Sequence, residues 1–161
     1  PDLFDMFGAL AAAAITVLVF VQRNRILIWS VFDALAPLFA ILGIGLGLGH
    51  LAAGTAFGLP ADLPWAVELW NANRHPTQMY ETLASALIFG LLWYKKHDPR
   101  PGILFLTYLA ITSGVQVFLM GFRADQTLIL SGIKQGQIIS LAVLAASFIL
   151  IEVRFHQLDK K

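Results

Sequence analysis

Five long apolar stretches, separated by short segments of charged and turn-forming residues, make up most of the chain. They cover about residues 7–21, 34–54, 78–94, 103–122 and 135–152. Runs of this length with so few charges are typical of membrane-spanning helices, because a hydrocarbon core about 30 Å thick needs roughly 20 apolar residues per span. The pattern predicts an all-α, polytopic transmembrane helical bundle of about five spans.

The composition agrees with a membrane protein. Of the 161 residues, 58% are hydrophobic and only 13% are charged, and the mean hydropathy is +0.73. This length leaves room for the spans and short loops, so we expect a single transmembrane domain over residues 1–161. The chain has no cysteine, which excludes a disulfide, a thiolate metal site and a cysteine nucleophile. A net charge of +1 provides no basic field for nucleic acid.

The distribution of the eleven Lys and Arg residues predicts the orientation. Eight of them fall on one side of the predicted membrane: Arg23, Arg25, Lys95, Lys96, Arg100, Arg154, Lys160 and Lys161. The other side holds Arg74, Arg123 and Lys134. Because cytoplasmic loops carry the excess of cations, we expect the N terminus outside and the C terminus in the cytoplasm. The start at Pro1 leaves open whether upstream residues are missing, and no cleavable signal peptide is recognised.

The second stretch carries glycine at positions 43, 45, 47 and 49, which gives two Gly-x-x-x-Gly pairs. Close helix packing explains such pairs. A phosphate-binding loop would need a following Lys and Ser or Thr, whereas His50 and Leu51 follow here. Asp33, four residues before Pro37, is expected to be a helix-start or interfacial residue without a functional role.

The loop from Thr55 to Thr77 is the longest polar stretch, and chemistry is most expected at its end. The segment there reads Arg74-His75-Pro76-Thr77-Gln78-Met79-Tyr80-Glu81. Pro76 suits the first turn of a helix, and a helix N-terminus attracts anions, so Arg74 and His75 can hold a lipid phosphate. The alternative is a helix cap with an interfacial polar cluster. Glu81 lies inside a predicted span, where an acid is costly unless it has a partner.

A second polar group follows the fourth stretch on the same outer side. It contains Arg123 and Asp125, and Gln137 lies near the start of the fifth stretch. We hypothesise that these residues converge with His75 and Glu81 and that Arg123 pairs with Glu81. The alternative for Arg123 is snorkelling to the interface. The histidines, at positions 50, 75, 97 and 156, are scattered, so no metal site is expected.

Residues 75–81 match throughout the His-Pro-Ser/Thr-Gln-Leu/Met-Tyr-Glu signature of the prolipoprotein diacylglyceryl transferase family, which the chain therefore resembles. Three flanking segments agree in order and spacing: residues 32–37, 58–67 and 136–140. The resemblance implies a bacterial inner-membrane enzyme without a cofactor that transfers a diacylglyceryl group from phosphatidylglycerol to a lipobox cysteine. It also implies that the chain corresponds to the last five of seven spans.

The chain departs from the family pattern at polar positions that the resemblance implies are essential. When the family pattern is aligned backwards from residues 58–60, Gly47 stands in place of an arginine and His50 in place of an asparagine. Ala53 then replaces a second asparagine, and Thr55 replaces a glutamate. Gln116 and Met120 stand where an arginine and a glutamate are implied in the fourth span. Phe7–Leu10 stands where the family has a catalytic histidine.

Three functions follow from these observations. The first is a non-catalytic protein on this scaffold, acting as a lipid-binding or structural subunit of a larger membrane complex. The alternative is an active phosphatidylglycerol–prolipoprotein diacylglyceryl transferase, with His75 and Arg123 as candidate catalytic residues. A transporter or channel is disfavoured, because the spans hold few ionisable groups. The residues expected to bind the phosphatidylglycerol-like headgroup are Arg74, His75, Gln78, Tyr80, Glu81, Arg123 and Gln137.

Overall fold

The computed structural model describes residues 6–95, 100–130 and 132–159. Within these ranges the helices are α1 (Met6–Arg23), α2 (Ile28–Ala53), α3 (Thr77–Lys95), α4 (Ile103–Phe122) and α5 (Gln135–Asp159). Two of the connections contain a short antiparallel hairpin: β1 (Val67–Leu69) pairs with β2 (Ala72–Arg74) between α2 and α3, and β3 (Leu128–Leu130) pairs with β4 (Ile133–Lys134) between α4 and α5. The predicted all-α membrane bundle is confirmed, with a helix in each of the five expected stretches.

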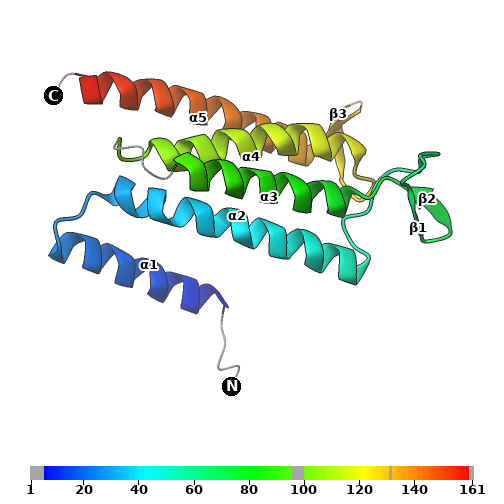
Figure 1. Cartoon of the computed structure of the whole chain (residues 1–161), viewed down its shortest axis with the longest axis horizontal. Helices are drawn as coiled ribbons and strands as arrows, with labels where there is room; N and C mark the ends of the chain where they lie inside the picture. Colours follow the sequence, from blue (N-terminus) through cyan, green and yellow to red (C-terminus); the bar gives the residue numbers. More distant parts are fainter. Residues whose placement is uncertain (1–5, 96–99, 131, 160–161) are drawn as a thin grey trace.

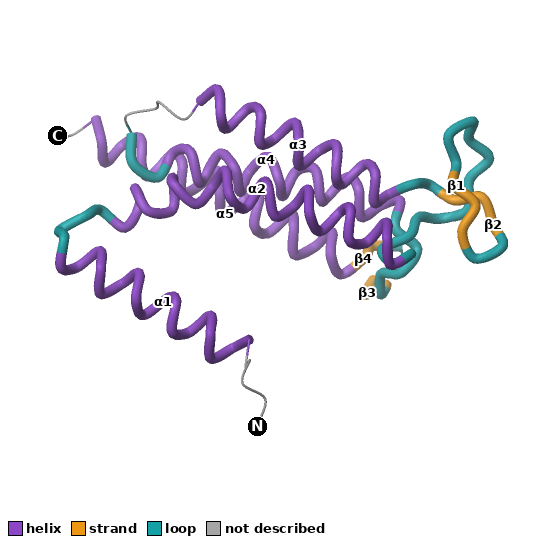
Figure 2. Tube along the Cα trace, turned by 60° about the horizontal axis from the view of Figure 1, so that its bottom comes forward, coloured by secondary structure: helices purple, strands orange, loops and turns teal. Residues whose placement is uncertain are grey.

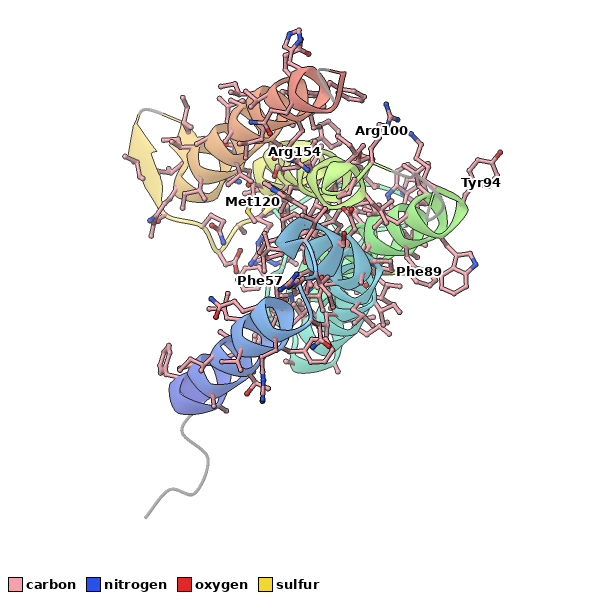
Figure 3. The ribbon with its side chains drawn as sticks, turned by 90° about the vertical axis from the view of Figure 1, so that its left-hand side faces the viewer. Phe57, Phe89, Tyr94, Arg100, Met120 and Arg154 are labelled. Atoms are coloured by element: carbon pink, nitrogen blue, oxygen red, sulfur yellow. The ribbon has the colours of Figure 1, made fainter. Side chains whose placement is uncertain are left out.

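The helices α2, α3 and α4 pack together, and α5 packs along α4 (Figure 1). Seen end-on, α1 lies to one side of the other helices, and Tyr94 projects away from the bundle (Figure 3). Within the described residues, α2, α4 and residues 135–157 of α5 are long and apolar enough to cross a membrane. The orientation of the bundle stays a prediction from charge. In its favour, the α1–α2 connection, the beginning of α4 and the end of α5 lie at the same end of the bundle (Figure 1).

The start of α2 differs from the prediction. The helix begins at Ile28, six residues before the expected start, and Pro37 lies inside it. A proline in a helix interior removes one backbone hydrogen bond but does not always end the helix. Here α2 continues because its inner face packs on α3 and α4, where Ala36 and Ala40 join a core with Ile88 and Leu92.

The glycines of α2 divide between two faces of the helix. A Cβ at Gly47 would lie 2.3 Å from Thr82 Oγ1 and 3.2 Å from the Gln78 carbonyl oxygen, and one at Gly43 would lie 2.7 Å from Ser85 Oγ. A Cβ at Gly45 or Gly49 would meet nothing within 4 Å. The predicted close packing therefore applies to the 43/47 pair alone, which brings α3 against the backbone of α2.

Asp33 has a structural role that the sequence did not reveal. Its carboxylate accepts hydrogen bonds from the backbone N–H groups of Gly102 (2.6 Å) and Phe105 (2.8 Å). These two donors belong to the first turn of α4, whose own N-cap residue, Gly102, has no side chain to accept them. Asp33 on α2 thus caps α4 from outside and fixes the start of one helix to the side of another.

Replacing Asp33 by alanine is expected to lower the free energy of unfolding by about 1–3 kcal/mol, because two helix N-terminal donors lose their acceptor. The measurement is thermal unfolding in detergent, followed by circular dichroism. Asp62→Ala is the control, since Asp62 is an exposed loop carboxylate. Equal melting temperatures for the two variants would contradict the capping role.

The connections at the opposite end of the bundle are held together by backbone pairing. The β1–β2 hairpin extends beyond the helix ends (Figure 2). Leu59 N–H donates to the Phe122 carbonyl at 2.7 Å, and Ala124 N–H donates to the Phe57 carbonyl at 2.9 Å. These bonds join the loop after α2 to the end of α4, and so fix the position of Arg123 between them.

Candidate functional site

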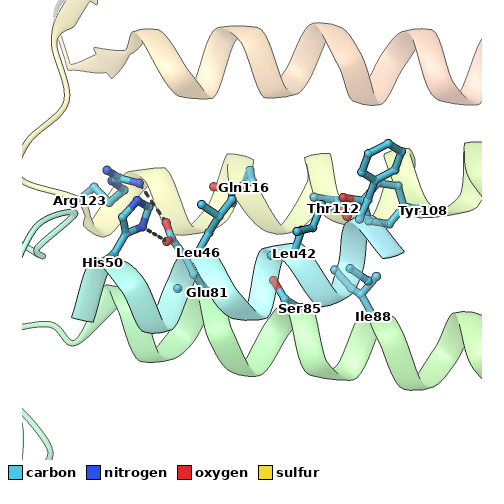
Figure 4. A pocket seen from close by; sticks show the side chains of 14 residues that line it. Leu42, Leu46, His50, Glu81, Ser85, Ile88, Tyr108, Thr112, Gln116 and Arg123 are labelled. Carbon is cyan, nitrogen blue, oxygen red and sulfur yellow. Dashed lines mark hydrogen bonds and ion pairs between the residues drawn. The ribbon is translucent and has the colours of Figure 1, made fainter. Parts of the chain in front are cut away.

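A cavity of about 360 Å³ lies between α2, α3 and α4 (Figure 4). The wall on α2 contains the close-packing glycines and four larger side chains, Phe39, Leu42, Leu46 and His50. The walls on α3 and α4 are formed by Glu81, Ser85, Ile88, Tyr108, Thr112 and Gln116, with Arg123 at the end.

The cavity has the character of an amphiphile-binding groove. His50, Glu81 and Arg123 lie together at one end, and Tyr108 and Ile88 lie at the other (Figure 4). Helix geometry puts His50 and Phe39, eleven positions apart on α2, about 16 Å from each other along the axis. Leu42 and Leu46 are 60% and 63% exposed, so the groove is open along its side rather than enclosed.

Glu81 is the centre of the polar end. The residue is 8% exposed, and its Oε1 accepts a hydrogen bond from Arg123 Nη1 at 3.1 Å. Its other oxygen, Oε2, lies 3.5 Å from His50 Nδ1. The structure thus supports the hypothesis that Arg123 is the partner of Glu81, and it gives the acid a second partner from α2. An acid this deeply buried needs such partners, since an uncompensated charge is costly there.

Arg123 is held from its other side by Asp125. Its Nε and Nη2 donate to the two Asp125 oxygens at 2.9 and 2.7 Å, in a bidentate pair. The hydrogen bond that Arg123 donates to Asp125 raises the pKa of the Arg123 guanidinium, and the same bond holds the pKa of Asp125 below its ordinary value. The guanidinium therefore stays charged and faces two carboxylates at once.

The stability conferred by Asp125 is expected to depend on pH. Since its pKa is lower in the folded state, the contribution is complete above its ordinary pKa, about 3.9, and is lost as the pH falls through the lowered pKa. Thermal unfolding of the native chain and of Asp125→Asn between about pH 6 and pH 2 should show a difference that shrinks as the pH falls. A difference that is constant over this range would contradict the pairing.

Lys134 fixes the backbone beneath Arg123. Its Nζ donates to the carbonyl oxygens of Gly121, at 2.8 Å, and Arg123. Burial lowers the pKa of this ammonium from its ordinary value. Gln137 completes the arrangement, because its Oε1 accepts from Lys134 N–H and its Nε2 donates to the Val117 carbonyl. Gln137, expected to contact a headgroup, therefore joins α5 to the end of α4.

The signature segment holds the loop after α2 in place. Thr77 Oγ1 donates to the Ala56 carbonyl at 2.6 Å, and Gln78 Nε2 donates to the Thr55 carbonyl at 2.8 Å. Both side chains are buried, so the Gln78 amide bonds to the backbone of this loop. These two hydrogen bonds hold the start of α3 against the end of α2. Glu81, one helical turn after Gln78, therefore lies opposite His50.

The other predicted residues lie outside this cavity. Arg74 and His75 line a separate cavity of about 100 Å³, whose other walls come from the end of α2, from β1 and from the start of α3. Arg74 donates to the carbonyls of Leu69 and Gly58. The His75 ring packs 4.9 Å from the Phe122 ring, centroid to centroid, and the Tyr80 hydroxyl accepts from Trp65 Nε1 at 2.9 Å. The structure thus brings Glu81 and Arg123 together and leaves Arg74, His75 and Tyr80 elsewhere.

His50 is the site residue that sequence reasoning missed. Its alignment with an asparagine of the family pattern marks the position but predicts no role for a histidine there. The residue lies on the face of α2 that carries Gly43 and Gly47, at spacings of four and three residues. That face packs on α3, where Glu81 lies. The signal was therefore present in the helical spacing between the packing glycines and the next polar residue.

Comparison with known proteins identifies the family. The family model described as prolipoprotein diacylglyceryl transferase matches residues 4–153. The chain belongs to the prolipoprotein diacylglyceryl transferase family. Three curated relatives carry the name phosphatidylglycerol–prolipoprotein diacylglyceryl transferase. They come from Finegoldia magna (31% identity over 90% of this chain), Bordetella avium (31% over 89%) and Thermosynechococcus vestitus (34% over 86%).

The chain spans 59%, 58% and 56% of the length of these three relatives. The relatives are bacterial, and three helices among the described residues are long and apolar enough to cross a membrane, which makes the chain a bacterial membrane protein. Within this family member, the segment that carries the signature, residues 75–81, is the one that positions the loop after α2 and the carboxylate of Glu81.

Proposed function

We propose that this chain binds phosphatidylglycerol in the groove between α2, α3 and α4 and takes part in diacylglyceryl transfer to prolipoproteins in the bacterial inner membrane. The observation that carries the proposal is the shape of the groove, polar at one end, apolar beyond it and open along its side. A phospholipid has the same distribution of polar and apolar parts. The names of the curated relatives favour transfer over binding alone.

The position of Arg123 suits the headgroup phosphate. The guanidinium lies at the polar end of the groove, its orientation is fixed by Asp125, and it remains charged. A planar guanidinium is the side chain best matched to a phosphate. In transfer, the departing glycerol phosphate gains negative charge, and a fixed cation at that point stabilises the transition state.

A second function, lipid binding without turnover, is favoured by the same end of the groove. Arg123 faces two carboxylates, and the neighbouring groove residue on α4 is the neutral Gln116. At Gly47, even a Cβ would lie 2.3 Å from Thr82 Oγ1, so an arginine does not fit there in this packing. With fewer cations for the leaving phosphate, the chain would serve as a lipid-binding subunit of a larger membrane assembly.

The two functions are separated by one experiment. The purified full chain, in nanodiscs that contain phosphatidylglycerol, is incubated with a lipobox peptide, and the peptide mass is measured for a thioether-linked diacylglyceryl group. Native mass spectrometry of the same sample reports bound lipid and associated subunits. Modified peptide establishes transfer, and bound phosphatidylglycerol without modified peptide establishes the binding function. The absence of both modified peptide and bound lipid would refute both functions.

A further inference from the structure

The imidazole of His50 is a group that neither the signature nor the predicted site included. It lines the groove, and its Nδ1 is buried and makes no hydrogen bond to the described residues. Glu81 Oε2 lies 3.5 Å from this nitrogen. That distance is within ion-pair range and slightly long for a hydrogen bond, as catalytic contacts often are before substrate binds.

We infer that His50 and Glu81 form a proton-accepting pair, with His50 as the general base for the thiol substrate and Glu81 as its positioning residue. This inference rests on the proposed transfer function. Glu81 faces Nδ1, and a carboxylate at that nitrogen stabilises the tautomer with the proton on Nδ1. In that tautomer the lone pair is on Nε2, so the ring can accept a proton while Glu81 stabilises the imidazolium that results.

The step balances with the groups at hand. The thiol proton moves to His50 Nε2, the thiolate sulfur forms a bond to the glycerol carbon, and the bond between that carbon and the phosphate oxygen breaks. The electron pair of the broken bond leaves with the glycerol phosphate, whose charge faces Arg123. No oxidation or reduction takes place. Glu81 thus connects the proton acceptor on α2 to the cation at the end of α4.

Of the described histidines, His50 has the contacts that this role requires. His75 lines the separate, smaller cavity and packs against Phe122. His156 makes a comparable pair with Glu152, at 3.1 Å, but both side chains are about 70% exposed on the outer surface of α5. The chain therefore contains a matched control, a histidine–glutamate pair of the same chemistry outside the groove.

The test compares transfer by four forms of the full chain in nanodiscs that contain phosphatidylglycerol, with a lipobox peptide as acceptor. His50→Gln and His50→Ala are expected to lower the rate about 10²–10⁴-fold, the usual contribution of a general base. His156→Gln should leave the rate of the native chain unchanged. Added imidazole should restore part of the rate to His50→Ala and none to His50→Gln, which a purely structural role would not produce. Thermal unfolding and retained lipid binding show that each variant is folded.

The outcomes separate the inference from the function on which it rests. Transfer by the native chain that falls less than tenfold in both folded His50 variants would overturn the base assignment and leave the proposed function standing. Absence of transfer by the native chain would overturn both. A second measurement is independent of turnover. Nitrogen-15 NMR of labelled histidine should show the His50 proton on Nδ1 in the native chain and a changed tautomer population in Glu81→Gln, and a proton on Nε2 would overturn the pairing.

Discussion

Replacing Arg123 by glutamine is expected to lower diacylglyceryl transfer about 10²–10³-fold and to destabilise the fold by about 3–5 kcal/mol. In the proposed transfer, the rate falls because the departing phosphate loses a fixed charge-stabilising donor. The fold is destabilised because Glu81, 8% exposed, loses the Arg123 hydrogen bond and is left as a buried carboxylate beside a partly exposed histidine. Transfer is measured by mass spectrometry of the peptide, and stability by thermal unfolding.

A double-mutant cycle separates these two effects. Glu81→Gln combined with Arg123→Gln removes both charges, so its loss of stability should be smaller than the sum of the single losses. The loss of transfer should remain in the double variant, because the cation is still absent. Arg23→Gln, which changes an exposed arginine at the opposite end of the bundle, is the control. Additive stability losses, or full transfer by Arg123→Gln, would refute the role given to this residue.

Gly47→Ala is expected to lower the free energy of unfolding by about 1–3 kcal/mol, and the double change of Gly43 and Gly47 by more. An added Cβ at position 47 lies 3.1 Å from the backbone nitrogen of Thr82 as well as near the Thr82 hydroxyl. The backbone of α2 must therefore move away from the backbone of α3. A wider separation of α2 and α3 also draws His50 away from Glu81. The rate of transfer should therefore fall more than the loss of stability alone explains.

The same helix provides the controls for this prediction. Gly45→Ala and Gly49→Ala introduce the same methyl group on the outer face of α2, where nothing lies within 4 Å. These variants should be as stable as the native chain or up to about 1 kcal/mol more stable, because alanine favours the helix more than glycine does. Equal destabilisation by Gly47→Ala, Gly45→Ala and Gly49→Ala would contradict close packing with α3 as the cause.

The fold was largely predictable because its signal is local. Uncharged runs of about 20 residues determine the helices, and a buried acid such as Glu81 requires a cation, which pointed to Arg123. Both deductions depend only on the free-energy cost of removing polar or charged groups from water. The glycine pairs were predicted to pack, but periodicity alone could not tell the 43/47 face from the 45/49 face, since only the neighbouring helix distinguishes them.

Other contacts between distant segments could not be predicted from the sequence. Asp33 caps a helix that begins some 70 residues later, and no local pattern marks such a cap. Arg74 and His75 were expected to face the same ligand as Arg123 because they occupy the same side of the membrane. In the structure the loop after α2 passes between them, with Gly58 paired to Arg123 on one side and close to His75 on the other.

The open side of the groove has a consequence for how occupancy is controlled. Because Leu42 and Leu46 border the opening and are exposed along the helix, the lipid of the proposed function would enter by sliding within the leaflet and would keep its acyl chains in hydrocarbon throughout. Its occupancy would then follow the mole fraction of the anionic lipid in the leaflet, not an aqueous concentration. A change in the lipid composition of the bacterium would alter the saturation of this protein directly, with no change in its amount.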